Sequence, residues 1–111
     1  MVIARVGADV EGSVCGFAIV RTILDEAELL LIATDPARQR LGVGTTLLNA
    51  VVQMTEERSV SRLYVEVRHD NPALDFYYGH HFVKIGERLN YYRRSDGQVG
   101  HALTLVRKVP V

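Results

Sequence analysis

The segment Gln39-Arg40-Leu41-Gly42-Val43-Gly44 separates an apolar run, LLLIA at residues 29–33, from a helical pattern, TTLLNAVVQM at residues 45–54. Two glycines one residue apart at a helix start leave several backbone N–H groups unpaired, with little side-chain cover over them. The helix dipole adds partial positive charge at the same place, and Arg38 and Arg40 add formal charge. The segment therefore predicts a turn that binds an anion, most naturally a phosphate.

Hydrophobic periodicity around this turn predicts six strands and two helices. Apolar or small residues recur at the i, i+3, i+4, i+7 spacing of one helix face after the glycines, and the run before them suits a strand covered on both faces. The expected strands are residues 1–6, 14–24, 28–34, 61–68, 81–92 and 101–109, and the expected helices are 45 to about 57 and 73–79. Residues 7–13 are expected to form a turn, and Asp96-Gly97 signals a hairpin. The order β-β-β-α-β-α-β-β predicts an α/β fold with a mixed sheet, formed as a single domain over residues 1–111.

Composition narrows the class of protein. The chain has 111 residues, of which 48% are apolar and 23% charged, as in globular proteins. Thirteen basic side chains balance thirteen acidic ones, which argues against general nucleic-acid binding. There is no apolar span of 18 residues and no export signal, so we expect no membrane association and a cytoplasmic location. Cys15 alone cannot form an internal disulfide, and the four histidines show no metal-ligand spacing, so no metal is expected.

Other nucleotide sites fit the glycine turn less well. A P-loop needs a lysine directly after its last glycine, and Thr45 stands there. A dinucleotide fold has a third glycine three positions after Gly44, where this chain has Leu47. The glycines alone leave a plain helix-capping turn open as an alternative.

Four segments, in this order along the chain, resemble the GNAT superfamily of acetyl-CoA-dependent N-acetyltransferases. The turn fits the pattern Q/R-x-x-G-x-G/A, and IATDP at 32–36 is similar to the strand that precedes it in that family. LYVEVRHDN at 63–71 with ALDFYYGHHF at 73–82 resembles the family's "LxxEV…N…A…LY…GF" segment. LNYYRRSDGQVGHALTL at 89–105 is similar to the terminal hairpin of the ribosomal-protein alanine N-acetyltransferases.

The resemblance implies a set of site residues and acetyl-CoA as cosubstrate. Glu66 would be the general base and Tyr77 the general acid. Tyr91 and Tyr92 would grip the first backbone atoms of the acceptor. The residues that would contact acetyl-CoA are Ile32, Ala33, Thr34, Arg40, Leu41, Gly42, Val43, Gly44, Thr45 and Asn71.

The implied reaction is acetyl transfer to a protein N-terminal α-amine, with a ribosomal protein bearing an N-terminal alanine as the expected partner. An α-amine has a pKa of about 7.7 to 8, so a base is needed before it can attack the thioester. A small amine or a lysine side chain as acceptor stays open, as does a module that binds acyl-CoA without catalysis. In isolation, Glu66 would be a solvated strand residue and Tyr91 and Tyr92 would be packing aromatics.

The chain departs from the family pattern in three ways. The spacing from Asn71 to Tyr77 is one residue short, which leaves Tyr78 as the alternative acid, and His81 replaces the usual glycine before Phe82. Family members also begin with a strand and one or two helices, which the sequence lacks before its first predicted strand. Those helices form one wall of the acceptor site. We therefore expect exposed apolar surface there, which would favour a homodimer.

Overall fold

Six strands and two helices make up the chain in this computed structural model, which describes residues 2–10, 13–37, 42–93, 97 and 99–109. For residues 2–6, 8–10, 13–14 and 92–93 it describes the backbone alone. The elements, in chain order, are β1 (Val2–Val10), β2 (Ser13–Ile23), β3 (Glu26–Thr34), α1 (Val43–Glu57), β4 (Arg62–Arg68), α2 (Leu74–Gly79), β5 (Val83–Arg93) and β6 (Val99–Lys108). The predicted order β-β-β-α-β-α-β-β is confirmed.

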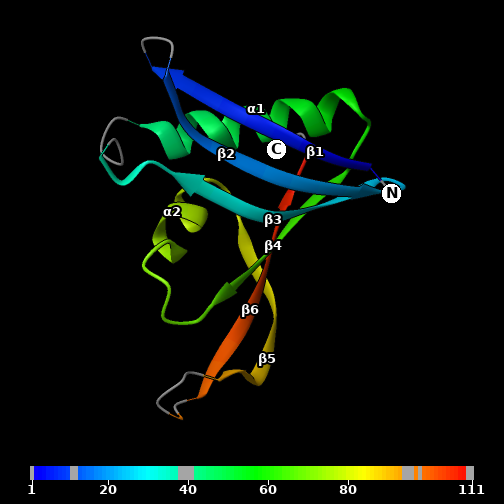
Figure 1. Cartoon of the computed structure of the whole chain (residues 1–111). Helices are drawn as coiled ribbons and strands as arrows, with labels where there is room; N and C mark the ends of the chain where they lie inside the picture. The colour runs from blue at the N-terminus through cyan, green and yellow to red at the C-terminus, as the bar shows by residue number, and fades with distance from the viewer. Residues whose placement is uncertain (1, 11–12, 38–41, 94–96, 98, 110–111) are drawn as a thin grey trace.

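The six strands form one mixed sheet with the order β1-β2-β3-β4-β6-β5. The neighbours in the sheet are antiparallel except for β3 and β4, which run parallel. A parallel pair needs a crossover connection, and α1 supplies it between these two strands. Figure 1 shows the result: β1, β2 and β3 form one half of the sheet, and β4, β6 and β5 form the other.

The two halves meet along a short stretch only. Glu26–Leu29 of β3 pair with residues 62–65 of β4, and the pairing ends there. At the same level β3 carries a bulge, because its register with β2 passes from Val20 opposite Leu29 to Ile19 opposite Leu31. Bulges bend a strand and increase its twist. Beyond Leu29 the two strands therefore diverge, as Figure 1 shows, with α2 beside the opening.

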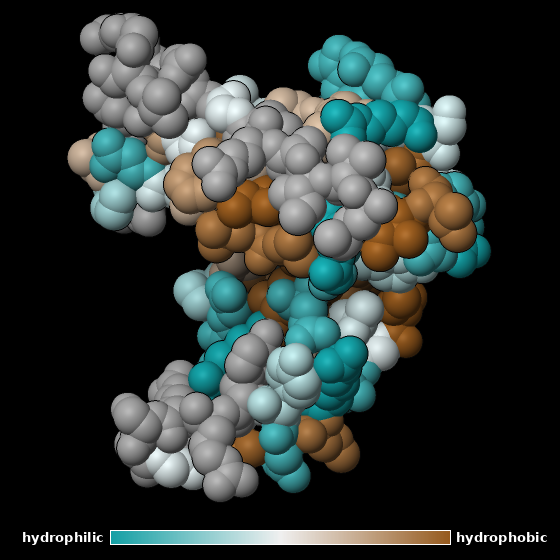
Figure 2. Space-filling view, turned by 45° about the vertical axis from the view of Figure 1, so that its right-hand side comes forward, coloured by the Kyte–Doolittle hydropathy of each residue, from teal (hydrophilic) through white to brown (hydrophobic). Residues whose placement is uncertain are grey.

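The main core lies on the face of the sheet that α1 covers. The buried residues of α1 follow the predicted helical spacing, and they are Val43, Leu47, Leu48, Val51, Val52 and Thr55. Of these, Leu48, Val51 and Val52 pack in one cluster with alternate strand residues such as Val20, Leu63 and Val65. On the other face Phe17, Ile23 and Leu31 stay exposed. Figure 2 shows brown, apolar surface gathered over the upper half of the molecule.

The expected turn at residues 7–13 is wrong. Strand β1 continues to Val10 and β2 begins at Ser13, so the connection is much tighter than predicted. Gly7 and Asp9, read as turn residues in the sequence, pair across the hairpin with Phe17 and Val14. Cross-strand pairing thus overrides their local preference.

Neither described helix could cross a bilayer, since the longer of the two, α1, has 15 residues.

Candidate active site

The opening between β3 and β4 leaves one edge of β3 without a strand partner. Ile32, Ala33 and Thr34 pair with β2 on one side, and their pairing with β4 has already ended at Leu29. Their remaining backbone groups face the opening. Backbone N–H and C=O groups in such a position need partners, so this edge is suited to an extended polar ligand. The three predicted contact residues therefore lie where such a ligand could pair with them.

The start of α1 lies at the end of this opening and has the features of an anion site. Gly42 adopts a left-handed conformation (φ 75°) as N-cap, with no side chain bonded to the first turn and no acidic residue in it. The carbonyl of Gly42 accepts hydrogen bonds from the N and Oγ1 of Thr46, at 3.0 and 3.1 Å. Among the described residues nothing accepts a hydrogen bond from the N–H groups of Val43, Gly44 and Thr45, so this helix start is suited to an anion.

Not all of the predicted turn can be placed. Arg40 and Leu41 lie outside the described residues. The side chain of Val43 is buried in a small cluster with Cys15 and Leu47, so this residue can contribute only its backbone N–H.

Asn71, predicted to contact acetyl-CoA, also has a structural role. Its Oδ1 accepts a hydrogen bond from the N–H of Ala73 at 2.8 Å, and its carbonyl accepts one from Leu74 at 3.1 Å. The side chain thus closes the turn that leads into α2. Asn71 is exposed, so its Nδ2 can still donate a hydrogen bond to a ligand.

The start of α1 and the helix α2 approach each other through two contacts that the sequence did not indicate. A Cβ added at Gly44 would lie 3.5 Å from Cε1 of Phe76, and Thr45 Oγ1 lies 3.3 Å from Nε2 of His80. Burial lowers the pKa of His80 below its usual 6.5, with further lowering from the positive charge of Arg107. The imidazole is therefore neutral at pH 7 and can hydrogen-bond to the Thr45 hydroxyl.

Tyr77 lies in the main core at 5% exposure, whereas Tyr78 is 43% exposed. The Tyr77 ring packs edge-on against Phe82 with centroids 5.4 Å apart. Its hydroxyl has no hydrogen bond to another described residue, yet the oxygen is not fully enclosed. Burial raises the pKa of Tyr77 above its usual 10.0, so the phenol keeps its proton at neutral pH.

His81 adopts a left-handed conformation (φ 70°) directly after α2. A glycine is favoured there because it lacks the Cβ that makes this conformation costly. His81 thus adopts the backbone conformation that explains why the family pattern has a glycine at this position. The match supports the register in which Tyr77, five residues before Phe82, is the family tyrosine.

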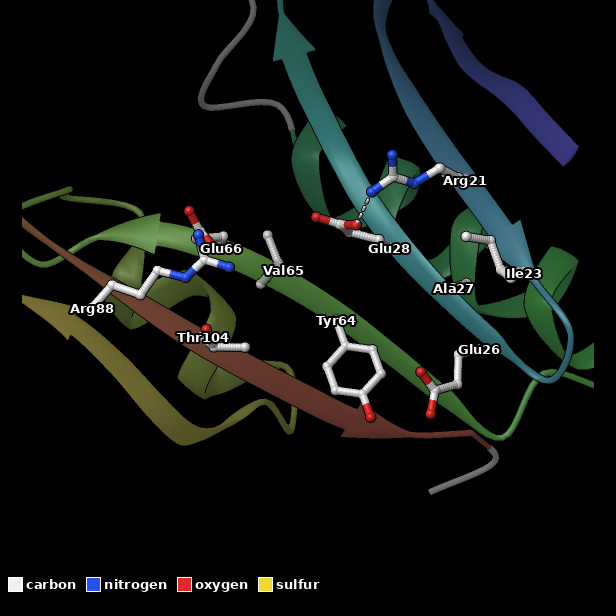
Figure 3. A pocket seen from close by; sticks show the side chains of 10 residues that line it. All are labelled: Arg21, Ile23, Glu26, Ala27, Glu28, Tyr64, Val65, Glu66, Arg88 and Thr104. Atoms are coloured by element: carbon white, nitrogen blue, oxygen red, sulfur yellow. Dashed lines mark hydrogen bonds and ion pairs between the residues drawn. The ribbon is translucent and has the colours of Figure 1, made fainter. Parts of the chain in front are cut away.

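Glu66 lies on the open face of the sheet and lines a pocket of about 300 Å³, shown in Figure 3. Nε of Arg88 lies 3.9 Å from its Oε2. Across the pocket Arg21 forms an ion pair with Glu28. The lining residues are Arg21, Ile23, Glu26, Ala27, Glu28, Tyr64, Val65, Glu66, Arg88 and Thr104.

Glu66 and Tyr77 belong to opposite faces of the sheet. Along β4 the buried residues Leu63, Val65 and Val67 point into the core that contains Tyr77. Glu66 alternates with them and therefore points to the open face. Since β3 and β4 have separated at this level, a group held in the opening could be reached by Glu66 from one side and by Tyr77 from the other.

The two tyrosines predicted to bind the acceptor, Tyr91 and Tyr92, lie on β5 at a bulge. The register of β5 with β6 passes from Arg88 opposite Ala102 to Tyr92 opposite Gly100. Tyr91 is half-exposed, and the guanidinium carbon of Arg88 lies 4.9 Å from the centroid of its ring. Tyr92 is described only by its backbone. Arg88 thus links Tyr91 to Glu66, a connection that the sequence analysis missed.

No group of three or more His, Cys, Asp or Glu side chains that could hold a metal ion occurs among the residues described. Cys15 is buried.

A sheet that opens between two parallel strands, beside a helix start with two glycines and no side-chain cap, is suited to an extended ligand that carries a phosphate group. Comparison with known proteins then gives the family. The model of the acetyltransferase (GNAT) family matches residues 2–82, and the chain belongs to this family.

Among similar proteins, the [ribosomal protein bS18]-alanine N-acetyltransferase of Escherichia coli K12 is 41% identical over 88 residues, covering 78% of this chain and 60% of that protein. The crystal structure of the ribosomal-protein-S18-alanine N-acetyltransferase from Escherichia coli superposes with a TM-score of 0.89 at 34% identity, over 98% of this chain and 70% of that one. Ard1 from Thermoplasma volcanium has a TM-score of 0.78 at 35% identity, over 91% and 67%. The chain thus spans about 60% of the length of the E. coli relative.

Proposed function

We propose that this chain is the acetyl-CoA-binding part of an N-acetyltransferase that modifies the N-terminal α-amine of a ribosomal protein beginning with alanine. The observation that carries the proposal is the opening between β3 and β4, with Glu66 on one face of the sheet and Tyr77 on the other. Similarity to the alanine N-acetyltransferases supports the choice of acceptor. A ribosomal acceptor would be modified in the cytoplasm, so we propose that location.

The described residues fit acetyl-CoA at three places. The backbone of Ile32–Thr34 offers a free strand edge along which the pantetheine arm would pair. The N–H groups of residues 43–45 and the dipole of α1 would hold the pyrophosphate. The Tyr77 hydroxyl has no partner among the described residues, so it would be free to donate a hydrogen bond to the sulfur atom. When bound, acetyl-CoA supplies the acetyl group as a thioester.

In the proposed mechanism Glu66 removes the proton that the α-amine must lose. The amine has a pKa of about 7.7 to 8, so much of it is protonated near pH 7, and the Glu66 carboxylate would accept that proton directly or through one water molecule. The amine nitrogen then forms a bond to the thioester carbonyl carbon, and the carbon–sulfur bond breaks. A backbone N–H on the free edge of β3 would stabilise the negative charge that develops on the carbonyl oxygen.

Tyr77 supplies the second proton transfer. Its raised pKa keeps the phenol protonated, so it can donate to the thiolate as that group leaves. Base and acid approach from different faces of the sheet, which keeps the attacking and leaving groups apart. No covalent enzyme intermediate is required, which agrees with the burial of Cys15.

The acceptor would lie on the open face. Arg88, whose guanidinium packs against the ring of Tyr91, lines the pocket that contains Glu66. Apolar side chains exposed on the same face, including Phe17 and Leu31, favour association with a further surface. Sedimentation measurements on the purified chain test whether that surface is a second copy.

The test compares acetyl transfer from acetyl-CoA to a peptide with an N-terminal alanine and to the same peptide with a blocked N-terminus. The α-amine proposal requires transfer to the first peptide only. Transfer to both would indicate a side-chain acceptor instead. Acetyl-CoA binding without transfer to either would indicate a binding module.

Glu66→Gln tests the base. We expect kcat/KM to fall about 100-fold near pH 7, because general-base catalysis typically contributes that much or more. The loss should shrink as the pH rises through the pKa of the α-amine, since the amine then deprotonates without help. Glu56→Gln, at an exposed glutamate of α1, serves as the matched control and should leave the rate unchanged. An equal loss at every pH would contradict the role of Glu66.

A further inference from the structure

Two histidines from distant parts of the chain form a hydrogen-bonded pair behind the β5 bulge. His69 follows β4, His101 lies on β6, and the ring centroids are 5.0 Å apart. The N–H of His101 donates to Nδ1 of His69 at 3.0 Å, and the N–H of His69 donates to the carbonyl of His101 at 2.9 Å. Neither the sequence patterns nor the proposed mechanism assigns this pair a role.

His101 also holds the bulge itself. Between the pairs Arg88–Ala102 and Tyr92–Gly100, three residues of β5 stand opposite His101 alone. The middle one, Asn90, has a left-handed conformation (φ 56°), which is uncommon for a residue other than glycine. Its N–H donates to Nδ1 of His101 at 3.1 Å. The imidazole thus provides an acceptor for a backbone group that ordinary strand pairing leaves without one.

The two backbone donors fix the tautomer of both rings. A backbone N–H can only donate, so Nδ1 of His69 and Nδ1 of His101 are the acceptors in these two bonds. The carbonyl oxygen of His101 also lies near Nδ1 of His69, but at 3.4 Å it is farther than the N–H of His101 at 3.0 Å, so the shorter contact sets the tautomer. In each neutral ring the proton is therefore on Nε2. The pair is a chain of directed hydrogen bonds that runs from His69 through His101 to Asn90.

These hydrogen bonds lie on the side of the sheet opposite the pocket. Leu103 and Leu105 of β6 point into the core, and Thr104 between them lines the pocket. Side chains alternate between the two faces along a strand, so His101 lies on the same face as the two leucines, the face that the helices cover. It therefore supports the bulge from behind without touching an acceptor. On the pocket side the bulge carries Tyr91, and Arg88, which lies beside Glu66 in Figure 3, immediately precedes it.

We propose that His101, oriented by His69, is a positioning residue that fixes the β5 bulge and thereby sets where Arg88 and Tyr91 meet the acceptor. The inference rests on the proposed function for the identity of the ligand, an N-terminal peptide. His101 itself makes no contact with reacting atoms. Its loss should therefore weaken acceptor binding and leave the chemical step and acetyl-CoA binding as they are.

The experiment compares His101→Leu, which removes the acceptor, with His101→Asn, whose Oδ1 can replace Nδ1. For His101→Leu we expect the KM of the alanine peptide to rise about fivefold, as for the loss of one hydrogen bond, with kcat and the Kd of acetyl-CoA unchanged. His101→Asn should restore most of the loss. His81→Asn replaces an exposed histidine that tolerates the change, because asparagine accepts the left-handed conformation, and it should match the wild type.

Amide exchange and nitrogen spectra of the histidines give readouts that do not need activity. The Asn90 amide should exchange faster in His101→Leu than in the wild type, and the wild-type spectra should show both Nδ1 atoms without protons. An unchanged KM, a kcat that falls together with KM, or an Asn variant that behaves like Leu would overturn the proposal. If the wild type transfers no acetyl group, the proposed function and the acceptor part of this inference both fail. The exchange data would then still decide whether His101 fixes the bulge.

Discussion

Tyr77→Phe should separate catalysis from stability more cleanly than any other substitution in this chain. The ring is 5% exposed and packs against Phe82, so phenylalanine keeps almost every contact. The hydroxyl has no hydrogen bond to a described residue and is not fully enclosed. Its removal breaks no bond, and we expect the free energy of unfolding to change by less than about 0.5 kcal/mol. Tyr77→Ala, in contrast, should cost about 3 to 5 kcal/mol, because it leaves a cavity.

The same substitution should lower kcat strongly. A positioned general acid contributes about 100-fold or more, which corresponds to about 2.7 kcal/mol of transition-state stabilisation. The assay is acetyl transfer to the alanine peptide at saturating acetyl-CoA, combined with urea unfolding of the same preparations. Because burial raises the pKa of Tyr77 above 10.0, the wild-type kcat should show no alkaline decline from this group below that pH.

Tyr78→Phe is the matched control, since that side chain is its neighbour and is 43% exposed. It should change neither rate nor stability. A Tyr77→Phe enzyme with full kcat would refute the assignment of the acid, and a loss of rate in Tyr78→Phe instead would transfer the role to that residue. A large loss of stability in Tyr77→Phe would show that the hydroxyl has a partner which the described residues do not include.

Two further predictions concern the walls of the site. A Cβ at Gly16 would lie 2.5 Å from the carbonyl oxygen of Ala33, so Gly16→Ala must shift β3, and we expect a loss of about 1 to 3 kcal/mol in urea unfolding together with weaker acetyl-CoA binding by calorimetry. Gly79→Ala, with open space around the added methyl, is its control and should cost nothing. The pKa of His80 is lowered from 6.5, chiefly by burial and then by Arg107, so the folded state binds fewer protons than the unfolded state below that value. The contribution of His80 to the free energy of unfolding is therefore complete above pH 6.5 and is lost as the pH falls towards the pKa of the folded state. We expect Tm to decline less at acidic pH in His80→Asn than in the wild type. An identical decline in the two proteins would contradict this prediction.

The features that the sequence predicted correctly depend on the spacing of apolar residues within one element or on the properties of single residue types. The spacing of Leu47, Leu48, Val51 and Val52 placed α1, and the continuous apolar run placed β3. The glycine turn indicated a helix start without a side-chain cap because glycine has no side chain that could accept a hydrogen bond from the first turn.

The features that the sequence did not predict depend on contacts between distant residues. The bulge after Leu29 opens the sheet, and a bulge of one extra residue has no signature in composition. The bonds among His69, Asn90 and His101 join positions up to 32 residues apart. Thr45 meets His80 only because two helices approach each other. These contacts can be recognised only when the arrangement of strands and helices in space is known.

The place of β4 in the sheet has a consequence for how the protein folds. Strands β1, β2 and β3 can form two successive hairpins, and β5 with β6 can form a third, all from neighbouring segments. Strand β4 pairs with β3 and β6. In the sequence, α1 separates it from β3, and α2 and β5 separate it from β6. Such non-local pairings form late, because the chain must first close long loops. We therefore expect the insertion of β4 to limit the folding rate, so the strand that carries Glu66 is the last to be secured and the opening beside it is completed in the same step.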